Sequence, residues 1–88
     1  MSLEMETLDQ LIGGDMPLAV IRRLYADDQH FAKAIHGLLL SGDVRLRAPD
    51  GGDIPQWRWR ELFIAGAVFR EMPDLRLAIT SQGAQRLG

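Results

Sequence analysis

Apolar residues in the first half of the chain recur at three- and four-residue spacing, which is the period of an amphipathic helix. This pattern predicts helices near residues 4–12, 16–26 and 28–41. The first stripe ends at two glycines, the second begins beside a proline, and the third follows two aspartates that can cap a helix. Three helices are therefore expected before Gly42.

The hydrophobic period changes to two after Gly42. Val44 and Leu46 alternate with arginines, and a second alternation begins at Leu75, which is typical of half-exposed strands. We expect strands near residues 43–48, 67–72 and 75–79, in a small antiparallel sheet. Thr80 then begins a predicted last helix over residues 80–87.

The segment QWRWR, residues 56–60, fits either a strand or a helix. At period two its tryptophans point one way and its arginines the other, and a hairpin with residues 44–48 is geometrically simple. However, Asp53 is followed three residues later by glutamine, which is a capping-box pattern, and Pro55 suits a first helical turn better than a paired strand. We therefore predict a helix over residues 54–65 and keep the strand as the alternative.

The apolar faces of these elements predict the hydrophobic core. Its expected members are Leu18, Ile21, Leu24, Phe31, Ile35, Leu38, Leu39, Val44, Trp59, Leu62, Phe63, Val68, Leu77 and Ile79. A weak internal repeat runs through the same region, because LLLSGDVRLRAPD (38–50) aligns without a gap with LFIAGAVFREMPD (62–74). Both segments read as a helix end, a glycine, a short strand and a Pro-Asp turn.

Residues 54–88 resemble the winged helix-turn-helix superfamily. In that superfamily, an arm of this type forms the end of the recognition helix, the two strands of the wing and the helix that follows. The matching residues are Leu62, Gly66, Val68, Leu75, Leu77, Thr80, Gly83 and Leu87. The segment from Met16 to Val44 also looks like a helix-turn-helix followed by a strand. The resemblance implies one α+β, winged-helix-like domain over residues 1–88, with three to five helices and a two- or three-stranded antiparallel sheet.

The resemblance implies DNA binding less strongly than it implies the fold. The expected wing between Val68 and Leu75 is short and nearly neutral, whereas DNA-binding members commonly carry a longer basic loop there. The loop near residue 50 is acidic. Because winged domains also serve as protein-docking modules, the fold by itself does not give the function.

Charge and composition narrow the chemistry further. The 88 residues carry a net charge of −2, with −4 over residues 1–43 and +2 over residues 44–88, so a polyanion should prefer the C-terminal half. The absence of cysteine excludes disulfides, thiolate metal sites and a cysteine nucleophile. His30 and His36 lack a ligand set around them. We expect a cytoplasmic protein that is not an enzyme, needs no cofactor or metal, and has no membrane partner.

Interleaved tryptophan and arginine make residues 56–60 the strongest candidate site. Such a pattern serves phosphate contact with base stacking, a protein interface, or simply a core tryptophan beside solvated arginines. The residues expected to bind DNA or a partner are Gln56, Trp57, Arg58, Arg60, Lys33, Arg70 and Arg76.

Two functions from different classes follow. The first is a small winged-helix DNA-binding regulator of transcription, expected to be a homodimer, with helix 54–65 in the major groove of duplex DNA. The second is a winged-helix module that docks another protein through Trp57 and Arg60 and does not bind DNA.

Overall fold

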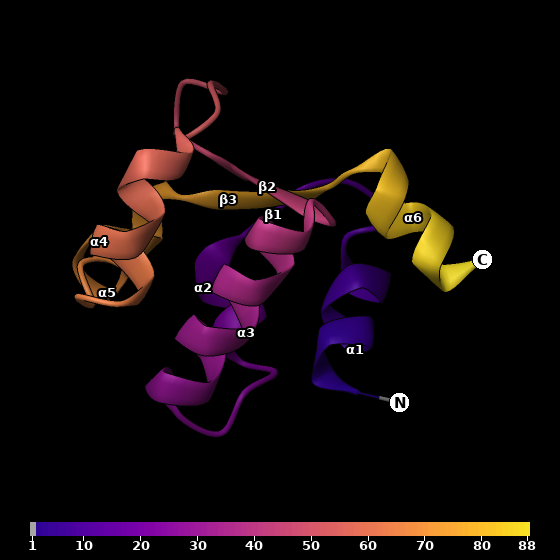
Figure 1. Ribbon diagram of the computed structural model, residues 1–88, viewed down its shortest axis with the longest axis horizontal. Helices are drawn as coiled ribbons and strands as arrows, with labels where there is room; N and C mark the ends of the chain where they lie inside the picture. The colour runs from indigo at the N-terminus through magenta and orange to yellow at the C-terminus, as the bar shows by residue number, and fades with distance from the viewer. Residues whose placement is uncertain (1) are drawn as a thin grey trace.

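The computed structural model describes residues 2–88 and has an α+β fold, as predicted (Figure 1). Its helices are α1 (Leu3–Gln10), α2 (Leu18–Arg22), α3 (Asp28–Ser41), α4 (Trp59–Phe63), α5 (Val68–Glu71) and α6 (Ser81–Leu87). Its strands are β1 (Met16–Pro17), β2 (Val44–Arg47) and β3 (Arg76–Ile79), and two 3-10 turns, η1 (Gln56–Arg58) and η2 (Met72–Asp74), precede α4 and β3.

The three strands form an antiparallel sheet in the order β1-β3-β2. Val44 pairs with Ile79 and Leu46 with Leu77, while Met16 pairs with the same Leu77 from the other side. The last strand of the chain therefore lies in the middle of the sheet. Both of its edges are occupied, which leaves no place beside it for a further strand.

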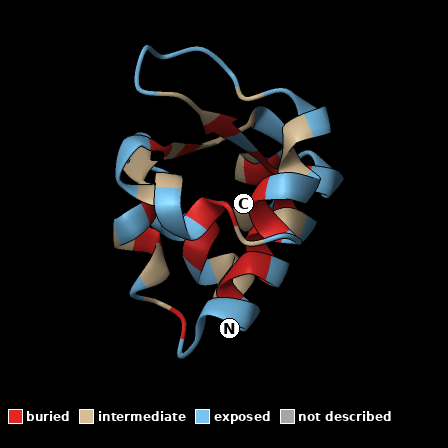
Figure 2. Ribbon diagram, turned by 90° about the vertical axis from the view of Figure 1, so that its left-hand side faces the viewer, coloured by how far each residue is buried: buried red, intermediate tan, exposed pale blue. Residues whose placement is uncertain are grey.

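The helices divide into groups around α3, the longest of them (Figure 1). Figure 1 shows α1 and α6 at one end of the sheet and α4 with α5 at the other, with α2 and α3 between them. Helix α3 packs against β2, α1 and α4. The residues coloured as buried lie where these elements meet (Figure 2).

Both ends of α3 follow the sequence expectation. The Asp27 side chain accepts a hydrogen bond from the His30 backbone N–H at 2.7 Å, so it caps the first turn. Gly42 has a φ of 85°, and its N–H and that of Asp43 donate to the carbonyls of Leu39 and Leu38. This is a Schellman ending, which favours glycine because only glycine adopts a positive φ without steric cost.

The helix expected over residues 16–26 is wrong at its start and too long. Met16 and Pro17 form β1, because Met16 pairs with Leu77 and the Leu18 N–H donates to the Leu75 carbonyl at 2.9 Å. Proline is tolerated here because β1 lies at the edge of the sheet. The second helix therefore begins at Leu18.

The strand expected over residues 67–72 is also wrong, because this segment forms α5. The Phe69 and Arg70 N–H groups donate to the carbonyls of Gly66 and Ala67, at 3.2 and 3.1 Å. Since both edges of β3 are taken by β1 and β2, a strand at 67–72 could not have paired with β3 as a wing hairpin. Local helical hydrogen bonds satisfy its backbone instead.

The prediction of helix rather than strand at residues 56–60 is confirmed, although the predicted start is wrong. The helical stretch begins at Gln56 as η1 and continues as α4 to Phe63. Asp53 does not cap it: its carboxylate accepts from Arg45 at 2.7 Å, and its backbone forms an isolated bridge with Arg47. A tertiary ion pair thus replaces the expected capping box.

These corrections change which residues fill the winged-helix pattern. A helix that ends at glycine, two paired strands and a final helix are present as α3, β2, β3 and α6. Leu38, Gly42 and Val44 hold the positions that the sequence assigned to the second copy of the repeat. Helices α4 and α5 lie in the long connection between the two strands. The arrangement is compatible with a small winged-helix-like fold.

The predicted core is largely confirmed. Of its members only Leu24, Trp59 and Ile79 are partly buried, and they pack against the rest. Leu8, Leu11, Tyr25, Leu46 and Leu75 join the buried cluster without having been predicted.

A buried carboxylate fixes α6 to the end of α3. Asp43 is fully buried, and its side chain accepts from Ser41 Oγ at 2.8 Å, from Gln82 Nε2 at 3.2 Å and from Arg86. Its backbone carbonyl accepts from the Thr80 N–H at 3.0 Å. Gly83 passes so close to this carbonyl that a Cβ at position 83 would overlap it. Glycine is therefore required at position 83 by close approach rather than by backbone conformation.

We predict opposite effects of alanine at two helical glycines. Gly83→Ala should lower the free energy of unfolding by on the order of 2 kcal/mol, because α6 must move away from Asp43. Gly37→Ala should raise it by about 0.5–1 kcal/mol, because no atom lies within 4 Å of the new methyl group. Urea denaturation followed by circular dichroism measures both. Equal stability of the two variants would contradict the close approach.

We predict that Tyr25 makes the free energy of unfolding fall at alkaline pH. Its side chain is buried and shares a 2.8 Å hydrogen bond with Thr7 Oγ1. Burial raises the pKa of Tyr25 above its ordinary value of 10, an effect that the Thr7 hydrogen bond partly offsets. As the pH rises, the Tyr25 hydroxyl therefore loses its proton in the unfolded chain before it does so in the folded chain. Its contribution to the free energy of unfolding is fully present below pH 10 and is lost as the pH rises through the pKa of the folded state. Tyr25→Phe should be less stable by about 1 kcal/mol at neutral pH. The difference in free energy of unfolding between the unmodified protein and Tyr25→Phe should become smaller above pH 10, as measured by urea denaturation at each pH.

Candidate functional site

The predicted site residues on η1 and α4 lie at the surface beside α3. Trp57 is 78% exposed, and Gln56 and Arg60 are exposed as well. Trp59 is half-buried, and its indole N–H donates to the Ile54 carbonyl at 3.2 Å. The two tryptophans therefore differ: Trp59 packs on the core, as predicted, and Trp57 faces solvent.

Arg58 is held by two carboxylates and does not project as a free side chain. Its Nη2 donates to Glu71 Oε2 at 3.0 Å and to Glu61 Oε2 at 3.3 Å, and only 24% of the side chain is exposed. The hydrogen bond to Glu71 is the main cause that raises the pKa of Arg58. Arg58 therefore links α4 to α5.

Arg76, the first residue of β3, is engaged in the same way. Its Nε lies 3.4 Å from Asp15 Oδ2 and its Nη2 donates to the Asp15 carbonyl at 3.2 Å. By contrast, Lys33, Arg60 and Arg70 are exposed and form no ion pair within residues 2–88. Of the predicted cations, these three keep their charge available to a ligand.

Two shallow hollows adjoin on this side of α3. The first, of about 530 Å³, is lined in part by Lys33, Phe63, Ile64 and Phe69. The second, of about 410 Å³, is lined by Leu40, Gln56, Trp57, Trp59 and Arg60. His36 lines both, and its ring stacks on Phe63 with centroids 6.1 Å apart. We call this surface the α3–α4 face; it comprises Lys33, His36, Leu40, Gln56, Trp57, Arg60, Ile64 and Phe69.

Large apolar side chains are exposed on the α3–α4 face. Ile64 is 62% exposed and Leu40 59%, and Phe69 is exposed to a lesser degree. The sequence interpretation did not include them in the site. Leu40 carried a usable signal, since three consecutive leucines on a helix cannot all face one core at 100° per residue. Ile64 and Phe69 lacked such a signal, because their exposure depends on where α4 ends and α5 turns.

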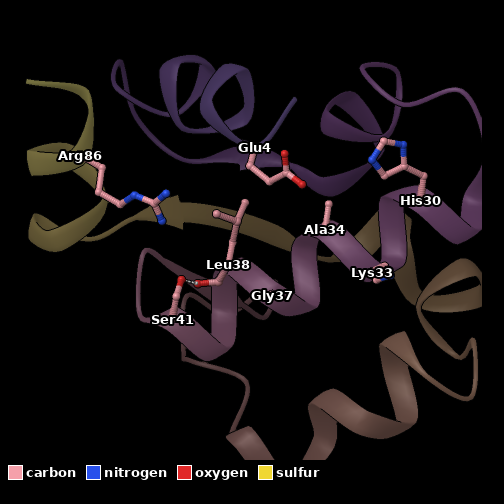
Figure 3. A pocket seen from close by; sticks show the side chains of 8 residues that line it. All are labelled: Glu4, His30, Lys33, Ala34, Gly37, Leu38, Ser41 and Arg86. Carbon is pink, nitrogen blue, oxygen red and sulfur yellow. Dashed lines mark hydrogen bonds between the residues drawn. The ribbon is translucent and has the colours of Figure 1, made fainter. Parts of the chain in front are cut away.

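A further pocket lies between α1, α3 and α6 and is mixed in charge (Figure 3). Glu4 projects into it from α1, while Lys33 and His30 line it from α3. Arg86 also lines it, but its guanidinium is already paired with Asp43. Because both charge signs are present and the arginine is engaged, this pocket does not define a ligand of one chemical class.

Metal and membrane sites find no support within the described chain. Among residues 2–88, no three His, Asp or Glu side chains are grouped as a metal-ligand set. None of the helices in the same range combines the length and apolar character needed to cross a bilayer.

Comparison of the chain with protein-family models, with curated proteins and with solved structures gives no match in any of the three. The α3–α4 face is therefore the feature of this chain from which a function can be inferred.

We predict that Arg58 and Arg60 differ in their contribution to stability. Arg58→Gln should lower the free energy of unfolding by about 1 kcal/mol, because it breaks the contacts to Glu61 and Glu71. Arg60→Gln is the matched control and should change it by less than about 0.5 kcal/mol. Thermal and urea unfolding of both variants measure the difference. Equal values would contradict the structural role of Arg58.

Proposed function

We propose that this domain is a winged-helix-like protein-interaction module that docks a partner on its α3–α4 face. The observation that carries the proposal is the exposure of Leu40, Trp57 and Ile64 around two adjoining hollows, beside the free cations Lys33 and Arg60. Contiguous exposed apolar side chains of this kind mark interaction sites on soluble domains.

The composition of the face supports a protein partner. Tryptophan and arginine are the side chains most often responsible for binding energy at protein interfaces, and Trp57 and Arg60 line the same hollow. Four large apolar side chains outnumber the two free cations of the face. A surface adapted to the phosphate backbone would show the opposite balance.

A DNA-binding regulator is the second candidate function, and one observation favours it. Lys33, Arg60 and Arg70 have no acidic partner within residues 2–88, and Gln56 is exposed near Arg60. In a helix-turn-helix the second helix enters the major groove, and on this candidate that helix would be α3 rather than residues 54–65. Arg58 and Arg76 do not contribute to this candidate, since both are ion-paired.

We predict that a photo-cross-linking amino acid at Gln56 will capture a protein partner in cells that naturally contain this chain. The same group at Asp50, an exposed loop position outside the face, is the matched control and should capture none. Trp57→Ala should lower the cross-linked yield at Gln56, because loss of an aromatic anchor costs on the order of 2 kcal/mol of binding.

Titration with duplex DNA at several salt concentrations tests the second candidate. The protein-interaction proposal expects no affinity that rises steeply as salt falls. The proposal is overturned if duplex DNA binds with a steep salt dependence, Arg60→Gln weakens that binding, and position 56 captures no protein. Sedimentation in the same buffer determines whether the expected homodimer forms.

A further inference from the structure

The α3–α4 face carries an excess of positive charge. Lys33 lines the first hollow and Arg60 the second, and neither forms an ion pair among the described residues. Asp28 is the acidic residue that lines these hollows, and its Oδ1 lies 2.8 Å from Arg22 Nε. The face therefore presents uncompensated positive charge beside apolar side chains, and its complement carries both acidic and apolar groups.

The spacing of the two hollows fits a helix. Lys33 and Leu40 line different hollows and are seven residues apart on α3, which is about 10 Å or two helical turns. A helical partner with apolar side chains at i and i+7 would place one in each hollow, and its residue at i+3 or i+4 would lie over His36. An extended partner would need a free strand edge, but no strand residue lines either hollow.

We infer that the α3–α4 face binds an amphipathic helical segment whose polar flanks are acidic. This inference deepens the proposed function, on which it rests, by assigning the chemistry of the partner. The apolar stripe of that helix fills the hollows at Ile64 and at Trp57, and its carboxylates pair with Lys33 and Arg60.

Two other occupants fit the face less well. A second copy bound through the same face would bring the cations of both copies, Lys33 and Arg60, into one interface, and like charges oppose one another there. Duplex DNA would satisfy the cations but would leave Leu40, Trp57 and Ile64 against phosphate and sugar.

The test uses a fluorescein-labelled synthetic peptide of about four helical turns, with leucines at i, i+4 and i+7 and glutamates on the remaining positions that flank them. One control peptide has the same composition in scrambled order, and another has lysine in place of glutamate. Fluorescence anisotropy should show the acidic amphipathic peptide binding about tenfold more tightly than either control. Trp57→Ala should weaken it by about tenfold or more.

Charge reversal gives the sharper result. The double variant Lys33→Glu/Arg60→Glu should lose about tenfold affinity for the acidic peptide and gain affinity for the basic one. Arg23→Glu reverses an exposed cation that lines neither hollow and should change neither affinity. If circular dichroism shows that the double variant is unfolded, Lys33→Gln/Arg60→Gln replaces it and should lose acidic-peptide affinity by about threefold.

Equal affinity for acidic and basic peptides overturns the inference. So does a homodimer that the charge-reversed variant abolishes, or duplex DNA that competes with the peptide at the same cations. If Gln56 cross-links to a protein but the peptides show no preference, only the acidic-helix inference fails. If neither a cross-link nor peptide binding occurs, the proposed function fails as well.

Discussion

The carboxylate of Asp43 is the contact on which the arrangement of the chain depends. A fully buried charge is costly unless hydrogen bonds and an opposite charge compensate it, and Asp43 receives Ser41, Gln82 and Arg86. These donors come from the end of α3 and from α6, while Asp43 itself leads into β2. The three elements are thus positioned together by one side chain, and the close approach of Gly83 is the steric counterpart of that contact.

Strand β3 lies between β1 and β2, and its central position determines where the candidate site lies. The connection between β2 and β3 must leave the sheet and return to its centre, and it does so as η1, α4, α5 and η2. Arg58 holds α4 to α5 through Glu61 and Glu71. The excursion packs against α3 and brings Trp57 and Ile64 beside Leu40 and Lys33, which are distant in sequence.

Ion pairing explains why some arginines of this chain do not offer their positive charge to a ligand. Arg58 pairs with the nearby Glu61 and with Glu71 from α5, and Arg76 pairs with Asp15 from the loop before β1. A local sequence pattern does not reveal the two distant partners, Glu71 and Asp15. The acidic partners of Arg22, Arg45 and Arg86 likewise become known only from the folded structure. The choice between DNA and protein as the proposed ligand therefore depends on which cations are left without an ion pair in the fold. The total number of arginines in the sequence matters less.

The sequence alone determined the elements whose signals are local. The aspartate cap and glycine end of α3, the alternation of β2 and β3, the helical character of residues 56–60 and most core positions follow from periodicity and capping, which act over a few residues. Trp57 and Arg60 could be selected as candidate site residues because the alternation of tryptophan and arginine is also a local feature.

Tertiary structure decided what depended on pairing between distant segments. The repeat gives Gly42 and Gly66 the same local pattern, but the segments that follow them differ in the fold. Met16–Pro17 pairs with one edge of β3 and β2 with the other, and Val68–Glu71 forms a helix. The exposure of Ile64 and Phe69 also depends on tertiary contacts. So does the ion pairing that removes Arg58 and Arg76 from the candidate site. Strand pairing, ion pairing and burial are contacts between residues far apart in sequence, and a local pattern carries no information about which distant partner will be present.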